Sequence, residues 1–150
     1  MEVLLASGFC RADTLDEEGR SALVVALMGE HTEVAEVLLR WGANPDLLLE
    51  TVDQGGTYRL FTALTVACHM GNHRAVSLLV RHGAEPVNPA DLLVDVVGFG
   101  HRACAQLLIA GCRLDVNQRD SSGRTPLSVA IVLACVSSVK LLLGSGADMT

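Results

Sequence analysis

"DSSGRTPLSVAIVLACVSSVKLLLGSGAD", residues 120–148, contains one complete structural unit. Its first four residues are a turn-forming cluster. Thr125 can cap the N-terminus of a helix, and Pro126 suits the first helical position. The apolar residues that follow recur at helical spacing until a break near Ala134, and a second helix is expected over 138–143. The stretch therefore predicts a turn, a helix, a second turn and a second helix.

The end of this unit recurs along the whole chain. Two apolar residues, two variable residues and a glycine appear in LLASG (4–8), LLRWGAN (38–44), LVRHGAE (79–85), LLIAGCR (107–113) and LLGSGAD (142–148). Each glycine is expected to take the left-handed C-cap of a helix. A recurrence of this kind predicts stacked repeats, because one helix pair cannot bury both of its faces.

The unit at 120–148 resembles the ankyrin repeat, whose pattern is roughly G-x-T-P-L-H-x-A followed by G-H-x-x-V-x-x-L-L-x-x-G-A-D. Residues 19–44 and 62–85 match this pattern in degenerate form, and residues 90–113 match poorly. In that poor match Asp91 and Asp95 fall where the family has a proline and a small packed alanine, which favours a distorted repeat. Residues 1–8 resemble the second helix of a repeat alone.

The resemblance implies an all-α ankyrin-repeat solenoid of stacked helix-turn-helix units joined by β-hairpin-like turns. The whole chain, 1–150, is expected to form a single array. Its approximate units are 1–14, 15–46, 47–86, 87–115 and 116–150, and we expect the array to be a fragment of a longer one. Alanines at 26, 67 and 130 are expected where helices approach closely.

One turn is longer than the repeat requires. "PDLLLETVDQGGTYRLF", residues 45–61, carries roughly eight residues more than the ankyrin spacing. An extended β-hairpin is the simplest form, with 48–52 paired to 57–61 across 53–56. The hairpin is expected to expose Leu47, Leu49, Tyr58 and Phe61 and to set the specificity of binding.

Composition and net charge argue against several classes of binding partner. The net charge is −6 and aromatic residues make up 3% of the chain, whereas nucleic-acid binding needs a basic face. The five cysteines form no C-x-x-C pair, which suits a reducing compartment, and no apolar run is long enough to span a membrane. We therefore expect a cytoplasmic and/or nuclear protein without a membrane, nucleic-acid or small-molecule partner.

Two patterns allow other chemistry. The glycines of Gly98–Ala103 have the form of a dinucleotide-binding fingerprint, with Asp115 as a ribose ligand, although too little chain follows for a doubly wound sheet. Cys68, His69 and His73 have a spacing that can hold zinc, although 70–72 should break the helix between them. No catalytic set emerges, so no enzyme activity, cofactor or metal is expected.

Proteins that resemble this family are mostly binding modules, with partners on the hairpin tips and the concave helix face. Carrying those positions over predicts that a protein partner contacts Glu17, Glu18, Arg20, Met28, Tyr58, Arg59, Phe61, His69, Met70, Val97, Ser121, Ser122, Arg124 and Val132. The expected role is a scaffold or the substrate-recognition arm of a larger adaptor. The alternatives are a kinase-inhibitor-like ankyrin protein, from the run 27–46, and a nucleotide-binding enzyme fragment. The resemblance also makes Asn117 a candidate for asparagine hydroxylation.

Overall fold

The structure, a computed structural model, describes residues 15–52, 54–56 and 58–147, with the backbone alone at 51, 52, 58 and 59. The half unit predicted at 1–14 lies outside these residues. The elements are α2 (Ala22–Met28), α3 (Thr32–Arg40), β1 (Leu49–Val52), β2 (Tyr58–Phe61), α4 (Ala63–His69), α5 (His73–Arg81), α6 (Pro89–Gly98), α7 (Arg102–Gly111), α8 (Pro126–Val132) and α9 (Val136–Gly144).

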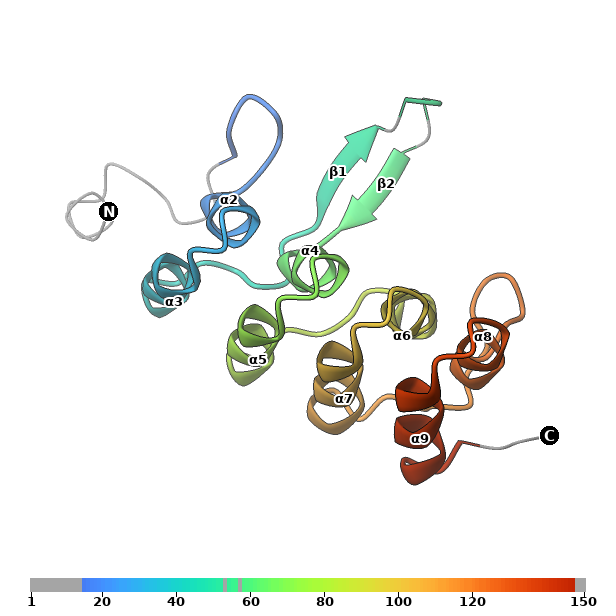
Figure 1. Cartoon of the computed structure of the whole chain (residues 1–150). Coiled ribbons are helices and arrows are strands. Elements are labelled where there is room, and N and C mark those ends of the chain that lie inside the picture. The colour runs from blue at the N-terminus through green and yellow to red at the C-terminus, as the bar shows by residue number, and fades with distance from the viewer. Residues whose placement is uncertain (1–14, 53, 57, 148–150) are drawn as a thin grey trace.

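The helices form two parallel rows (Figure 1). Helices α2, α4, α6 and α8 make one row, the inner helices, and each packs on the next. Helices α3, α5, α7 and α9 make the other row, the outer helices, which stack in the same way. Each inner helix also packs on the outer helix that follows it. The solenoid of stacked helix pairs predicted by the sequence is therefore confirmed.

The polar residue before an inner helix caps it in three units. The side-chain oxygens of Ser21, Thr62 and Thr125 accept hydrogen bonds from the backbone N–H three residues on, at 3.3, 3.4 and 3.2 Å. Thr125 caps α8, as the sequence predicts, and also completes a capping box with Ser128. These caps satisfy backbone donors that the first turn of a helix leaves unpaired, so each inner helix begins at a defined residue.

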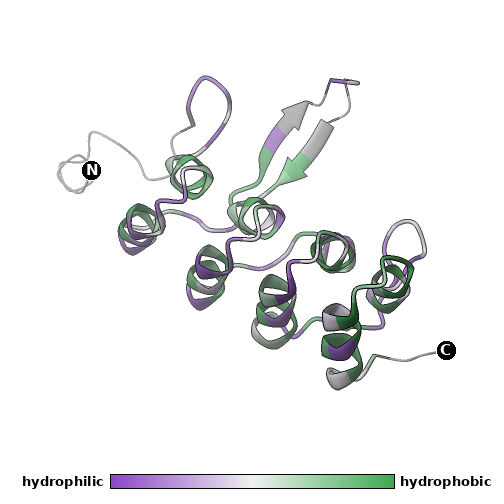
Figure 2. Cartoon of the chain, viewed as in Figure 1, coloured by the Kyte–Doolittle hydropathy of each residue, from purple (hydrophilic) through white to green (hydrophobic). Residues whose placement is uncertain are grey.

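The core lies where neighbouring units face each other. Leu23, Leu64, Leu93 and Leu127 occupy one equivalent position and are at most 5% exposed. The alanines at 26, 67 and 130 are buried at a second position, as expected for helices in close approach. Figure 2 shows the resulting apolar helices and the hydrophilic loop that precedes α2.

The third unit departs from the predicted register by one residue. Its core positions are taken by Leu93 and Val96, so Val96 stands where the other units have alanine. Asp91 therefore lies at the position of Thr62, and Asp95 lies on the half-exposed side of α6. The expectation of an acid at the packed alanine is wrong, because Val96 takes that position and Asp95 stays half-exposed. Because α6 begins at Pro89, it gains a first turn that the other inner helices lack.

Three of the predicted C-cap glycines are confirmed. Gly42, Gly83 and Gly146 have φ of 93°, 85° and 93°. Gly111 is different, because it ends α7 inside the helix and Arg113 takes the left-handed conformation with φ of 53°. A Cβ on Gly111 would lie 2.5 Å from Cγ1 of Val80. This glycine therefore permits the close approach of α5 and α7.

The extended hairpin is confirmed with slightly shorter strands. β1 pairs antiparallel with β2 and matches Leu49 with Phe61. Leu49 is only 2% exposed, and Leu47 and Phe61 are half-buried against the core. The expectation that these three are exposed is wrong, because the side chains of a strand alternate between its faces. The exposed apolar residues are instead Leu48 and Leu60, at 51% and 53%.

The last inner helix has one face without a neighbour among the described residues. Ile131 is 60% exposed, whereas the equivalent Leu27, Cys68 and Val97 are covered by the next unit and are at most 1% exposed. The prediction that Val97 contacts a partner is therefore wrong, because this residue belongs to the stacking interface. The unit boundaries and the membership of a longer array stay predictions.

The turns inside the helix pairs generate a first prediction. Gly100 and Ala134 stand at the same position of this turn, both left-handed, with φ of 76° and 53°. A Cβ costs about 1 kcal/mol in this conformation. Ala134→Gly should therefore stabilise the protein by up to about 1 kcal/mol, and Gly100→Ala should destabilise it by a similar amount. Urea unfolding of both variants measures this. A loss of stability in Ala134→Gly would contradict the assigned conformation.

The stacking interface generates a second prediction. Val97→Asn should lower the free energy of unfolding by about 2–4 kcal/mol, because it buries an amide and removes apolar contact. Ile131→Asn changes the same position of the last unit, where the side chain faces water, and should cost less than about 1 kcal/mol. Thermal unfolding compares the two. Equal losses would show that Ile131 is covered in solution.

Candidate functional site

Two loops on the hairpin side share the pattern D-x-x-G-R. In the first, one carboxylate oxygen of Asp16 accepts the backbone N–H groups of Glu18 and Arg20 at 2.9 and 2.8 Å, and the other accepts Nε of Arg20 at 2.9 Å. One carboxylate oxygen of Asp120 likewise accepts the backbone N–H groups of Ser122 and Arg124 at 3.0 and 2.7 Å, and the other accepts Nε of Arg124 at 2.9 Å. Each aspartate therefore fixes the loop that follows it.

Both aspartates are held in their charged form. Hydrogen bonding from the backbone N–H of Arg20 lowers the pKa of Asp16 below its ordinary value. For Asp120, desolvation raises the pKa, but the hydrogen bonds and the positive charge of Arg124 outweigh it, so the net shift is downward. Much of the hydrogen-bonding capacity of both arginines is thus used inside their own loops.

The two middle units have different loops. The second unit carries the β1–β2 hairpin in place of the short turn. The third has no such tip, because its chain passes from the buried Ala84 to the start of α6 at Pro89. The second unit, with its long hairpin, is therefore followed directly by a unit that has no projecting loop.

A hollow of about 640 Å³ lies beside the hairpin, and we call it the hairpin hollow. It lies between β2, α4 and α6. Its lining residues are Met28, Leu60, Phe61, Thr65, Val66, His69, Met70, Val87, Asn88, Asp91, Leu92 and Asp95. The walls are mainly apolar, and the chargeable groups among these residues are two carboxylates and one imidazole.

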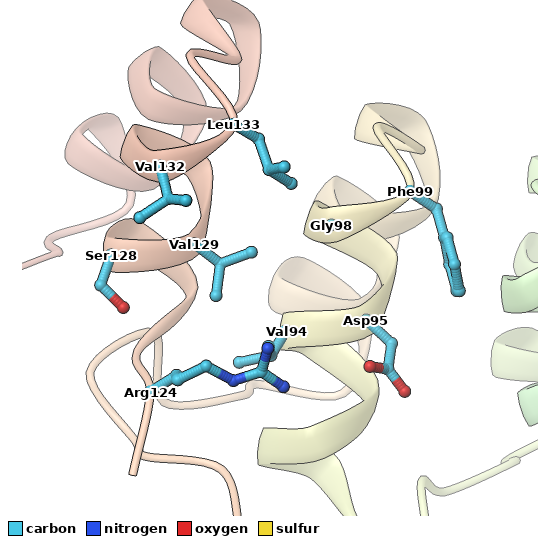
Figure 3. Close-up of a pocket in the computed structure, with 9 residues that line it drawn as sticks. All are labelled: Val94, Asp95, Gly98, Phe99, Arg124, Ser128, Val129, Val132 and Leu133. Atoms are coloured by element: carbon cyan, nitrogen blue, oxygen red, sulfur yellow. The ribbon is translucent and has the colours of Figure 1, made fainter. Parts of the chain in front are cut away.

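A second hollow of about 360 Å³ lies between α6 and α8 (Figure 3). Val129 and Leu133 of α8 point towards α6, and Arg124 reaches towards Val94. Gly98 stands where the other inner helices carry Met28, His69 and Val132, so its missing side chain leaves room. Asp95 lines both hollows, so the two adjoin at α6, and we call them together the groove.

The rim between the hollows is held by contacts across two units. Nε2 of His69 lies 3.6 Å from a carboxylate oxygen of Asp95, and the ring of Phe99 meets that of His69 edge-on at 5.5 Å. Nε2 of His101 donates to the backbone carbonyl of His69 at 3.2 Å. Asp95 thus lies beside an imidazole ring and is half-exposed.

The groove collects several of the predicted contact residues. Met28, Phe61, His69 and Met70 line the hairpin hollow, and Arg124 and Val132 line the second. Four others lie exposed on the two D-x-x-G-R loops, Glu17, Glu18, Ser121 and Ser122, and Arg20 is bonded within the first loop. The side chains of Tyr58 and Arg59 lie outside the described residues.

Among the groove residues that the sequence did not predict as contacts are Leu60, Val87, Asp91, Asp95 and Phe99. Leu60 was not among the hairpin residues expected to be exposed. Phe99 carried a usable signal, since it precedes a left-handed glycine just as Met70 does. The two aspartates were placed one residue out of register, because the third unit lacks the T-P-L motif.

The dinucleotide fingerprint and the zinc spacing both lie in local structure that differs from what those sites require. The fingerprint requires a strand before its glycines, whereas Gly98 ends a helix and 99–101 turns into another. Cys68 is buried while His69 is exposed, and α4 ends before His73, as expected. Among the described residues, no three His, Cys, Asp or Glu side chains converge on a metal position, and no helix has the length and apolarity to cross a membrane.

Helix pairs that stack mainly on their nearest neighbours define a solenoid repeat protein. The sequence profile of the Ankyrin repeat matches residues 18–48, 59–92 and 122–150, more than half of the chain. The chain therefore belongs to the ankyrin repeat family. Ankyrin repeats generally mediate protein–protein interaction, and the fold is typically non-catalytic. Most of the third unit lies outside the matched ranges, although it stacks like the others.

Curated relatives are longer than this chain. The ankyrin repeat and KH domain-containing protein mask-1 of Caenorhabditis elegans is 34% identical over 76 residues, which are 51% of this chain and 3% of that protein. The putative ankyrin repeat protein FPV014 of Fowlpox virus (strain NVSL) is 29% identical over 134 residues, 89% of this chain and 22% of that protein. In both, the matching array is a small part of a longer protein.

Solved structures share the fold over nearly the whole chain. The ankyrin repeat protein EF0377 superimposes with a TM-score of 0.79 at 23% identity, covering 98% of this chain and 75% of that one. The human ASB11 ankyrin repeat domain has a TM-score of 0.75 at 29% identity and covers 98% and 63%. The ankyrin repeat fold therefore extends over nearly the whole chain.

The matched loops generate a third prediction. The side chain of Asp120 is 2% exposed and that of Asp16 is 36% exposed. Asp120→Asn should therefore lower the unfolding temperature at pH 7 by several degrees, and Asp16→Asn by clearly less. Because the folded pKa of Asp120 is depressed, its contribution is full above the ordinary pKa of 3.8 and is lost as the pH falls through the folded value. Acid-unfolding curves should therefore show the stability difference between Asp120→Asn and the wild type becoming smaller in that acidic range.

Proposed function

We propose that this chain is a non-catalytic scaffold that binds a protein partner in the groove along the inner helices. One observation carries the proposal, which is a line of apolar side chains facing water at the ends of successive inner helices. Met28, Met70, Phe99 and Leu133 are 49%, 39%, 57% and 53% exposed. Single exposed apolar residues are normal, but several of them beside two hollows are typical of a protein interface.

The composition of the groove supports the same conclusion. Methionine and aromatic residues are enriched in protein interfaces. The chain has only three phenylalanines, and two of them, Phe61 and Phe99, line the groove. An apolar groove with few charges also suits a protein segment better than a nucleic acid, which needs basic side chains.

A narrower form of the proposal makes the chain the substrate-recognition arm of a larger adaptor. It is supported by the relatives, in which the matching array occupies a fraction of a longer protein. The kinase-inhibitor-like alternative rests on the sequence of 27–46 alone, and no contact in the structure favours it. A cytoplasmic or nuclear location is proposed as well, because the described cysteines are free thiols.

The test removes the apolar groove without touching the stacking core. Leu60→Ser combined with Met70→Ser should weaken capture of a partner at least about tenfold, because central apolar residues each contribute about 1–2 kcal/mol. Trp41→Ser is the matched control, since Trp41 is 47% exposed at the end of an outer helix. Quantitative pull-down from cell extract, with circular dichroism of each variant, measures the effect.

Two outcomes would contradict the proposal. In the first, capture survives in the groove variant and is lost in Trp41→Ser, which would place the interface on the outer helices. In the second, NAD binds to the chain in equilibrium dialysis and Gly98→Val abolishes that binding, which would support the nucleotide-binding alternative.

A further inference from the structure

The shape of the hairpin hollow leaves room for a segment of another chain. The hairpin stands on one side and the loop tip around Ser121 on the other, and the short third unit places no projection between them. The opening is walled by apolar side chains. Met28, Leu60 and Val87 are 49%, 53% and 43% exposed. An occupant that covers them must bring apolar surface of its own, because burial of apolar area drives such contacts.

The charge of the hollow restricts the occupant further. Asp91 and Asp95 lie four residues apart on one face of α6, so their side chains are neighbours. Among the residues that line the hollow there is no arginine or lysine. Like charges at this spacing destabilise a helix, and a cation between them would remove that cost.

Both carboxylates are positioned by the fold. One oxygen of Asp91 accepts the backbone N–H and the hydroxyl of Ser121 at 2.7 and 3.0 Å, which leaves the other oxygen of this carboxylate for a further donor. Asp95 faces His69, whose Nδ1 donates to the carbonyl of Thr65 at 2.8 Å. The side chains are thus oriented before any partner arrives, which lowers the entropy cost of binding.

We infer that the hairpin hollow binds a protein segment with an arginine or lysine next to an apolar side chain. The apolar side chain covers Leu60 and Met70, and the cation lies between Asp91 and Asp95. Arginine fits best, because its planar fork donates to two carboxylates at once. An acidic or phosphorylated segment is repelled by the same pair and by the net charge of −6. This inference rests on the proposed function.

Selection of random twelve-residue peptides displayed on phage tests the inference on the folded chain. The selected peptides should be enriched in arginine or lysine within about four residues of a large apolar residue, relative to the starting library. A synthetic copy of the strongest peptide should bind about fivefold more weakly to Asp95→Asn, the loss of one half-exposed ion pair. Glu33→Gln removes an equal charge from the outer helix α3 and should bind as the wild type does.

A charge reversal gives the sharper readout. Asp95→Lys should prefer a copy of the peptide with glutamate in place of its basic residue, whereas the wild type prefers the original. A change in the folding of Asp95→Lys would lower binding of both copies equally, so the reversed preference identifies a direct contact.

The outcomes separate this inference from the proposed function. Peptides that need Leu60 and Met70 but carry no basic excess and ignore Asp95→Asn would overturn the inference and leave the groove as the interface. Peptides that bind equally to the Leu60→Ser, Met70→Ser variant would place the interface elsewhere and overturn both. A selection that enriches acidic peptides, or none at all, overturns the inference.

Discussion

The burial of the inner helices between their neighbours is the constraint on which the rest of the structure depends. A single helix pair has two apolar faces and cannot cover both, so each unit is completed by the next. Leu64 and Ala67 are fully buried only because α2 and α6 lie on either side of α4. The stack therefore tolerates little change in the helices and much change in the loops between them.

That tolerance explains how the groove arises. The second unit gains a hairpin and the third loses its loop tip, while the inner helices continue to pack in order. The hairpin hollow results from the contrast between these two loops and from no single residue. The rim contacts of His69, Asp95 and Phe99 then join the second and third units at the place where the loops differ most.

Much of the fold and part of the groove were predictable from the sequence. The T-P-L and L-L-x-x-G motifs placed the helices, and the spacing of 41 between Gly42 and Gly83 revealed the inserted hairpin. The face of that hairpin was not predictable, because Leu47, Leu48 and Leu49 are consecutive and either phase buries a leucine. In the third unit, α6 starts one turn earlier, at Pro89, and Val96 replaces the usual alanine. The alignment of this unit with the repeat pattern was therefore predicted one residue out.

By itself, the sequence determined the repeat and its helix pairs, because these follow from local capping and from apolar spacing that recurs along the chain. Only the tertiary structure decided which side chains reach the groove. Leu60 and Val87 line the same hollow although they belong to different units, and Asp95 faces a histidine of the unit before it. Such contacts depend on how loops of unequal length lie over a regular stack, which no local pattern encodes.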